Sequence, residues 1–240
     1  MTTKTQLFRE QPLLNPPKPD EQQWCRPTDA DIRAINQVAG WYKDEGKHYA
    51  VMKYRGYLAM LGVPVDLPED EVREYKKFFD VSWHEGKWSN LAELYSFALS
   101  LGLAEKIPKE DEAKILEGFQ NAREKAEDDS TLIEYHMFML DIGLPQRLTP
   151  QEGERFKKNL ERYRKEGLVG SLAMCHAVLK HLGTRYEMPP EDVRIMRESL
   201  ECERANDIPK EFAHLLYLIS RAVRTEQKEE TTPLPPLKKI

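Results

Sequence analysis

The stretch TPQEGERFKKNLERYRKEGLVGSLAMCHAVLKHLG, residues 149–183, holds one nearly complete copy of the unit that decides the fold. It opens on Thr-Pro followed by an acidic residue, a typical helix start, because proline lacks the N–H that a first turn leaves unused. Apolar residues then recur at steps of three and four among charged ones, which is the period of an amphipathic helix. The pair Glu166-Gly167 interrupts this pattern, and a second, mostly apolar segment ends at Leu182-Gly183. The stretch therefore predicts two helices joined by a tight turn.

The same markers recur along the chain with one period. A Leu-Gly or Ile-Gly pair returns at spacings of 40, 41 and 40 residues, at Leu61-Gly62, Leu101-Gly102, Ile142-Gly143 and Leu182-Gly183. A proline that precedes acidic residues keeps nearly the same period, at Pro27, Pro68, Pro108, Pro150 and Pro190. Self-similarity at a fixed period is the signature of a repeat architecture, in which each unit packs on its neighbours. We therefore expect an all-α fold, an α-solenoid (superhelix) of about five helical-hairpin repeats with a period of about 40 residues.

The prolines also set the expected domain boundaries. The five repeats fall at 27–67, 68–107, 108–149, 150–189 and 190–225. The flanks differ from them in composition, since residues 1–26 carry four prolines and residues 226–240 end in TTPLPPLKKI. Proline-rich segments favour extended, polyproline-like conformations. We therefore expect an extended N-terminal arm over 1–26 and a C-terminal tail over 226–240, which either dock on a neighbouring protein or are disordered ends.

Composition narrows the class of protein. The chain carries 36 basic and 41 acidic residues, a net charge of -5, which argues against nonspecific binding to nucleic acid or to an anionic membrane. No apolar run reaches the roughly 18 residues of a membrane-spanning helix, and residues 1–19 lack the apolar core of a signal peptide. The three cysteines, Cys25, Cys175 and Cys202, share no paired spacing. We therefore expect an intracellular, reducing compartment.

Three units separate the Glu-Gly glycine from the Leu-Gly glycine by 16 residues, namely Gly46 to Gly62, Gly86 to Gly102 and Gly167 to Gly183. With this gap and a Gly-then-Pro turn after the second helix, the unit resembles the pentatricopeptide and tetratricopeptide class of helical-hairpin repeats over about residues 27–225. The resemblance implies two roles. Pentatricopeptide proteins commonly bind single-stranded RNA in organelles, whereas members of the class without RNA binding serve as structural subunits of large assemblies. It also implies a mitochondrial location; without it, we expect a cytoplasmic one.

The second helices are apolar beyond the stripe that a core needs, which suggests a surface for a partner. Positions 2, 6 and 9 residues before the Leu-Gly leucine would form ladders along the inner helices of a stack. The candidate partner-binding residues on these ladders are Met52, Arg55, Tyr95, Leu99, Ile133, His136, Leu140, His176 and Leu216. Such a groove would take a partner helix or an extended peptide. The alternative is that inner helices touch neighbours on three sides and that these residues are simply buried.

The first helix of the fourth unit holds six cations within eleven residues. They are Arg155, Lys157, Lys158, Arg162, Arg164 and Lys165. Acidic residues lie among them, so one interpretation is a solvated outer face with ion pairs between residues one turn apart. The other is a strip that contacts RNA phosphates, with an affinity that falls as salt rises.

No motif in the sequence names a reaction. Nothing matches a Walker A loop, a dinucleotide fingerprint, HExxH or GxSxG. His136 and His176 fall in the same slot of adjacent units, but zinc takes four ligands and the sequence nominates only these two. We therefore expect no catalytic residue, no metal or other cofactor, and no small-molecule substrate.

The expected function is that of a non-enzymatic protein–protein interaction scaffold, or of an accessory structural subunit of a larger assembly. It would bind other protein subunits through the inner helices and the extended arms. The alternative is a single-stranded RNA-binding, pentatricopeptide-like protein.

Overall fold

The computed structural model describes residues 23–85, 88–125, 128–183, 186–205 and 211–223, apart from the side chains of 78–85. Ten α-helices and no strand occur among these residues, so the predicted all-α class is confirmed. The helices are α1 (Asp29–Asp44), α2 (His48–Met60), α3 (Glu69–Glu85), α4 (Trp88–Ser100), α5 (Lys109–Glu124), α6 (Asp129–Asp141), α7 (Pro150–Glu166), α8 (Val169–Leu182), α9 (Pro190–Ala205) and α10 (Phe212–Val223). Within this described part, no helix combines the length and the apolar character needed to cross a membrane.

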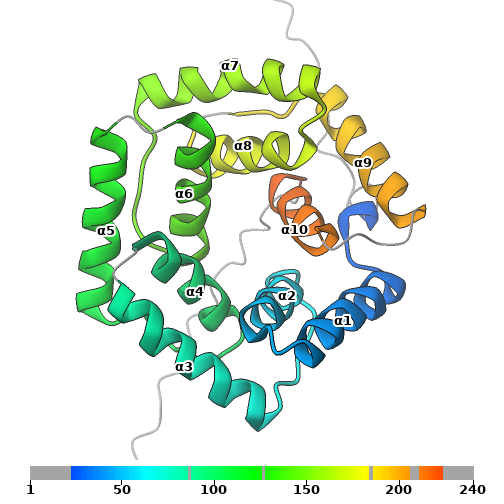
Figure 1. The fold of residues 1–240 in the computed structure, drawn as a ribbon. Coiled ribbons are helices and arrows are strands. Elements are labelled where there is room, and N and C mark those ends of the chain that lie inside the picture. The colour runs from blue at the N-terminus through cyan, green and yellow to red at the C-terminus, as the bar shows by residue number, and fades with distance from the viewer. Residues whose placement is uncertain (1–22, 86–87, 126–127, 184–185, 206–210, 224–240) are drawn as a thin grey trace, which may run out of the picture.

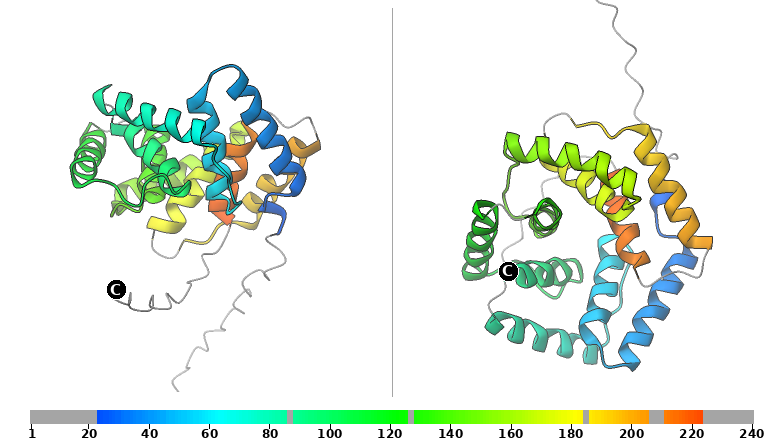
Figure 2. Two further views of the ribbon diagram at one scale, coloured as in Figure 1. Left: turned by 90° about the horizontal axis from the view of Figure 1, so that it is seen from below. Right: turned by 45° about the horizontal axis from the view of Figure 1, so that its top comes forward.

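The helices alternate between an outer and an inner layer (Figure 1). The outer layer holds α1, α3, α5, α7 and α9, and the inner layer holds α2, α4, α6, α8 and α10. Each inner helix contacts the next one along the chain, and α10 also contacts α2. The last pair of helices therefore meets the first, and the arrangement is a closed ring (Figures 1 and 2).

Local sequence signals set the ends of two outer helices. At the start of α1, the Thr28 hydroxyl accepts from the Asp31 N–H, and the Asp31 carboxylate accepts from the Thr28 N–H at 2.8 Å. Thr149 and Glu152 form the same capping box at the start of α7. Gly167 ends α7 in the left-handed conformation with φ +69°, which glycine adopts without a steric penalty. The cap at Thr149 and the end at Gly167 confirm the boundaries that the sequence predicted for α7.

The segment before α1 takes part in closing the ring. Of the predicted N-terminal arm, residues 23–25 form a short 3₁₀ turn in which Cys25 is fully buried; residues 1–22 lie outside the described ranges. The Arg204 guanidinium of α9 donates to the carbonyls of Trp24 and Arg26 at 2.9 and 3.0 Å, and the Ser220 hydroxyl of α10 donates to the Cys25 carbonyl. These bonds join segments 178 to 195 residues apart along the chain.

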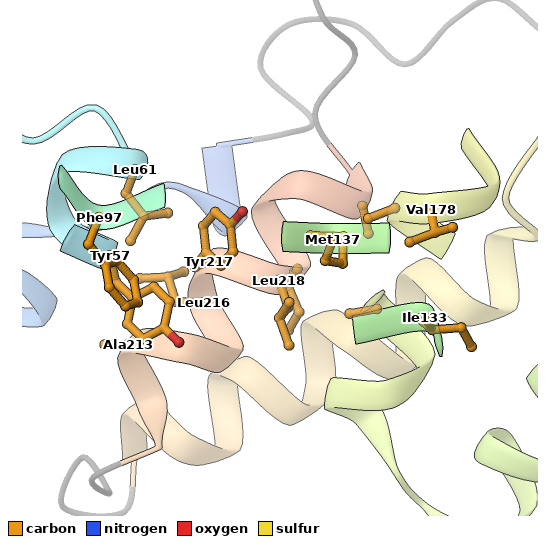
Figure 3. Packing of buried hydrophobic residues seen from close by; sticks show 14 of the residues in the cluster. Tyr57, Leu61, Phe97, Ile133, Met137, Val178, Ala213, Leu216, Tyr217 and Leu218 are labelled. Atoms are coloured by element: carbon orange, nitrogen blue, oxygen red, sulfur yellow. The ribbon is translucent and has the colours of Figure 1, made fainter. Parts of the chain in front are cut away.

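Aromatic side chains pack where the inner helices meet (Figure 3). The ring of Tyr57 in α2 lies 5.3 Å from that of Phe97 in α4 and 5.5 Å from that of Tyr217 in α10, centroid to centroid. Pairs of this kind add about 0.5–1.5 kcal/mol each to the burial of their apolar area. The close approach of α2 and α4 requires glycine at position 56, because a Cβ on Gly56 would lie 2.3 Å from Phe97 Cδ1. The same packing thus joins the first two repeats and closes the ring.

Candidate functional site

A buried acidic residue lies in the first turn of every outer helix. The five are Asp31, Glu71, Asp111, Glu152 and Asp192, at spacings of 40, 40, 41 and 40 residues. The helix dipole favours a carboxylate at this end, but each of the five is at most 6% exposed. A buried carboxylate is costly unless it is paired or hydrogen-bonded. The preceding repeat in the ring supplies the partners.

The first partner is a basic side chain near the end of the preceding outer helix. The pairs are Lys43–Glu71, Arg123–Glu152, Arg164–Asp192 and Arg204–Asp31. Arg123 donates to both carboxylate oxygens of Glu152 at 2.8 and 2.7 Å, a two-bond geometry that arginine favours. Burial raises the pKa of Glu152, but its contacts with His136, Arg123 and Thr149 hold the pKa well below its usual range. The position that would pair with Asp111 lies near the end of α3, among residues 78–85, whose side chains the structure does not describe.

The second partner comes from the preceding inner helix, six residues before the Leu-Gly position. The pairs are Arg55–Glu71, Tyr95–Asp111, His136–Glu152 and His176–Asp192. His176 Nε2 lies 2.8 Å from Asp192 Oδ2, whereas His136 Nε2 lies 3.8 Å from Glu152 Oε1. The fifth repeat has Leu216 in this position. The buried acid and its two partners therefore form a polar ladder that runs from repeat to repeat around the ring.

The two histidines thus serve the joints between repeats. Both are fully buried, and His136 Nδ1 lies 2.6 Å from Gln146 Oε1, while His176 Nδ1 is hydrogen-bonded to the Tyr186 hydroxyl. Burial lowers the pKa of His176 to about 4, although Asp192 opposes the shift, so this imidazole is neutral at pH 7. Across the described ranges, no three His, Cys, Asp or Glu side chains gather in a way that could hold a metal ion.

Most of the residues predicted to line a partner groove on the inner helices are buried in the ring. Six of the nine are buried between helices, namely Met52, Tyr95, Ile133, His136, His176 and Leu216. An inner helix of the ring has a neighbour on each side and an outer helix behind it, so these ladders face the protein interior. Arg55, Leu99 and Leu140 keep intermediate exposure, and Arg55 is paired with Glu71. Simple burial, the alternative considered from the sequence, accounts for most of this set.

The six cations of α7 do not form one uninterrupted strip. Arg164 and Arg155 donate to acids of neighbouring elements, Asp192 and Asp129. Lys157 pairs with the acid three residues earlier on the same helix. The remaining three are exposed, namely Lys158, Arg162 and Lys165. Half of the predicted phosphate-contacting set is therefore engaged within the chain.

A hollow lies between the inner helices, in the middle of the ring. Its lining comes from α2, α4, α6, α8 and α10, and its cavity volume is about 30 Å³, since most of the space between the lining residues is open to solvent. Figure 3 shows five of its lining residues, Tyr57, Phe97, Met137, Tyr217 and Leu218, at the meeting of these helices. Two further methionines, Met60 and Met174, also line it. Aromatic and methionine side chains offer an adaptable apolar surface of the kind used in binding sites.

Five residues that line the hollow share one repeat position, eight residues before the Leu-Gly position. They are Lys53, Glu93, Glu134, Met174 and His214. Unlike the buried acids of the ladder, they change in chemical type around the ring. Sequence reasoning missed this position because it followed the apolar ladders, and most residues here are polar. Alignment of the five repeats on the Leu-Gly position, which Ala222 occupies in the fifth, would have found it.

The charged groups of the hollow are mainly acidic. Three carboxylates, on Glu93, Glu134 and Asp141, face it together with one ammonium group, on Lys53. Lys53 Nζ lies 3.5 Å from Glu93 Oε1. The pKa of Glu134 is raised, first by desolvation and then by the negative charge of Glu93. Two carboxylates this close repel each other when both are ionised, and a cation bound between them relieves that repulsion.

Burial shifts the pKa of two further groups that line the hollow. Burial raises the pKa of Asp141 to about 6, against the opposing effects of Arg221 and of the Tyr217 hydroxyl, which donates to Asp141. Burial also lowers the pKa of His214 to about 4, and its imidazole stacks on Tyr57 with 5.0 Å between ring centroids. His214 is therefore neutral at pH 7, and it adds no positive charge to the hollow.

Comparison with known proteins adds no relative. No family model matches this chain, and no curated protein and no solved structure matches it either.

Proposed function

We propose that this chain is a non-enzymatic protein-interaction scaffold, or an accessory structural subunit of a larger assembly, built as a closed α-solenoid of five helical-hairpin repeats. One observation carries the proposal. The position that joins neighbouring repeats is acidic in all five, whereas the position that faces the hollow changes from Lys53 to Glu93, Glu134, Met174 and His214. The buried acids keep the joints between repeats alike, whereas the side chains that face the hollow differ from repeat to repeat. This combination is typical of a rigid scaffold that presents a surface for recognising a partner.

The charge of the hollow favours a protein partner over RNA. Phosphate contacts require lysine and arginine, but the hollow has three carboxylates against the ammonium group of Lys53. A protein segment with basic and apolar side chains complements this lining. The partner would therefore contact the hollow-facing side of the inner helices. The structural-subunit branch of the pentatricopeptide-like resemblance, and the mitochondrial location that it implies, belong to the same proposal.

The test is an affinity capture of the tagged full-length chain from its native cell, with bound protein and RNA both quantified. We expect protein partners in stoichiometric amount after nuclease treatment. The double variant Glu93→Gln/Glu134→Gln should lose them, because it removes two carboxylates from the hollow without changing their size. Glu154→Gln/Glu161→Gln, on the outer helix α7, is the matched control and should retain them. Equal recovery with both double variants would refute the hollow as the partner surface.

Single-stranded RNA binding is the second candidate, supported by the exposed Lys158, Arg162 and Lys165 of α7. In that case the captured material would be nuclease-sensitive RNA, released as salt rises. Lys158→Glu/Lys165→Glu would abolish its recovery, whereas the hollow variants would leave it unchanged.

A further inference from the structure

We propose that the hollow binds a segment of the same chain, residues 231–240 (TTPLPPLKKI), and that this segment competes with the partner protein for the site. The competition rests on the proposed function, whereas the intramolecular binding stands on its own. Residues 224–240 lie outside the described ranges, and it is their sequence, together with the lining of the hollow, that makes them suited to this site.

The segment and the hollow are complementary in charge and in apolar character. Residues 231–240 carry two lysines, Lys238 and Lys239, and no acidic residue. The hollow has three carboxylates, of which Glu93 pairs with Lys53 and Asp141 lies beside Arg221, and its walls are aromatic and methionine side chains. The cavity volume of the hollow is only about 30 Å³, so a bound segment would lie across its solvent-open mouth and contact the lining side chains from there. Its three prolines favour the extended conformation before binding, which reduces the entropy lost on binding.

The chain leaves the ring beside the hollow. The helix α10, which lines it with His214, Tyr217 and Leu218, ends at Val223. Lys180 of α8 donates to the carbonyls of residues 222 and 223 at 3.0 and 3.2 Å, which holds this end of α10 in place. Arg221, two residues before that end, lies 3.7 Å from the hollow-lining Asp141. The fifteen residues from 223 to 238 span up to about 50 Å when extended, so the lysines can return to the hollow.

The N-terminal segment is a poorer match. Residues 1–22 carry three basic residues, Lys4, Arg9 and Lys18, and three acidic ones, Glu10, Asp20 and Glu21. Their net charge is zero, and acidic side chains would meet the carboxylates of the hollow. The segment 231–240 is therefore the terminal segment that the charge of the hollow selects.

The experiment places a photo-reactive group in the full-length chain, through the substitution Leu237→p-benzoylphenylalanine. After irradiation at low protein concentration, cross-linked peptides are identified by mass spectrometry. We expect intramolecular cross-links to α2, α6 and α8 near Met60, Met137 and Met174. Adding Lys238→Glu/Lys239→Glu should lower their yield by about tenfold, the combined effect of two weakened ion pairs. Circular dichroism would verify that every variant is folded.

Cross-links confined to the outer helices, cross-links between two molecules, or a yield that ignores the lysine substitutions would each overturn the proposal. The affinity capture of the partner tests the proposed function independently of the cross-linking result. Loss of partner with Glu93→Gln/Glu134→Gln, together with absent cross-links, would retain the scaffold function and reject the internal segment. Higher partner recovery with Lys238→Glu/Lys239→Glu would support the competition.

Discussion

The joint between the fourth and fifth repeats and the joint that closes the ring satisfy the same buried acid in different ways. In the first, Asp192 is fully buried and contacts both Arg164 of α7 and His176 of α8. The imidazole in turn contacts the Tyr186 hydroxyl. This joint is thus a network of four side chains, in which every member has a partner.

At the closing joint, Leu216 replaces the inner histidine, and Arg204 is the one basic side chain that the described residues bring to Asp31. Arg204 also donates to the carbonyls of Trp24 and Arg26. The comparison teaches that repeats adjacent in sequence are joined by a side-chain ladder. At the closing joint, by contrast, one arginine pairs with the buried acid and also holds the backbone of the segment before α1, beside the Ser220–Cys25 hydrogen bond and the packing of α10 on α2.

The largest effect is expected where the ladder is most buried. Asp192→Ala would leave Arg164 and His176 without their buried acceptor, so we expect a loss of about 3–5 kcal/mol in the free energy of unfolding. Urea denaturation followed by circular dichroism measures this loss. Glu191→Ala, the neighbouring exposed acid, is the control and should change stability by less than about 0.5 kcal/mol. Equal losses in the two variants would contradict the ladder.

The closing joint should respond more weakly and more locally. Arg204→Ala removes the bonds to Asp31 and to two carbonyls, but the joint connects the two ends of the ring and can open without unfolding the rest. We expect a loss of about 2–3 kcal/mol, together with faster amide hydrogen exchange in α1 and α10. Arg194→Ala, on the exposed face of the same helix, should leave both quantities unchanged. Uniformly faster exchange in all helices would mean that the ring has no separable closing joint.

Close packing distinguishes the joint between the first two repeats. Gly56→Ala would place a Cβ 2.3 Å from Phe97 Cδ1, so α2 and α4 must separate, and we expect a loss of about 1–3 kcal/mol. Gly153→Ala makes the same change on α7, where a Cβ meets nothing within 4 Å, and it should stabilise the chain by about 0.5–1 kcal/mol. Thermal or urea unfolding of the two variants gives the signs. Destabilisation by both would mean that helix geometry, rather than the contact with Phe97, decides the effect.

Local signals in the sequence were enough for the helices, but not for the ring. The Thr-Pro start and the Gly167 end of α7 depend on neighbouring residues only, and the structure has them as predicted. Ring closure depends on the rotation between successive pairs, which contacts such as Gly56 against Phe97 set across 41 residues. No single repeat contains that information. The burial of Cys25 beside α10 is likewise a long-range result that local composition did not indicate.

The candidate site was harder to predict for a related reason. Acidic residues such as Asp192 were visible at helix starts, where the helix dipole is sufficient to explain them. Their partners lie in the preceding repeat, so the ladder emerges only when the repeats are aligned and placed side by side. Apolar periodicity indicated which helix faces are buried, but it could not separate a core face from a binding groove. His136 and His176 were assigned to the groove for that reason.

The smallest effect comes from giving the joint at Asp192 the composition of the closing joint. His176→Leu keeps Arg164 on the acid, as Arg204 remains on Asp31, so we expect a loss of only about 1–2 kcal/mol at pH 7. Burial lowers the pKa of His176 to about 4, so between pH 6.5 and 4 the unfolded chain binds a proton that the folded chain does not, and the wild type loses stability as the pH falls. The variant has no histidine at this position and does not lose this part of its stability. The difference in the free energy of unfolding between wild type and variant should therefore become smaller as the pH falls. Met174→Leu, on the same helix, is the control, and its difference in free energy of unfolding from the wild type should not depend on pH. If the difference for His176→Leu were also independent of pH, the imidazole would already carry the proton in the folded state.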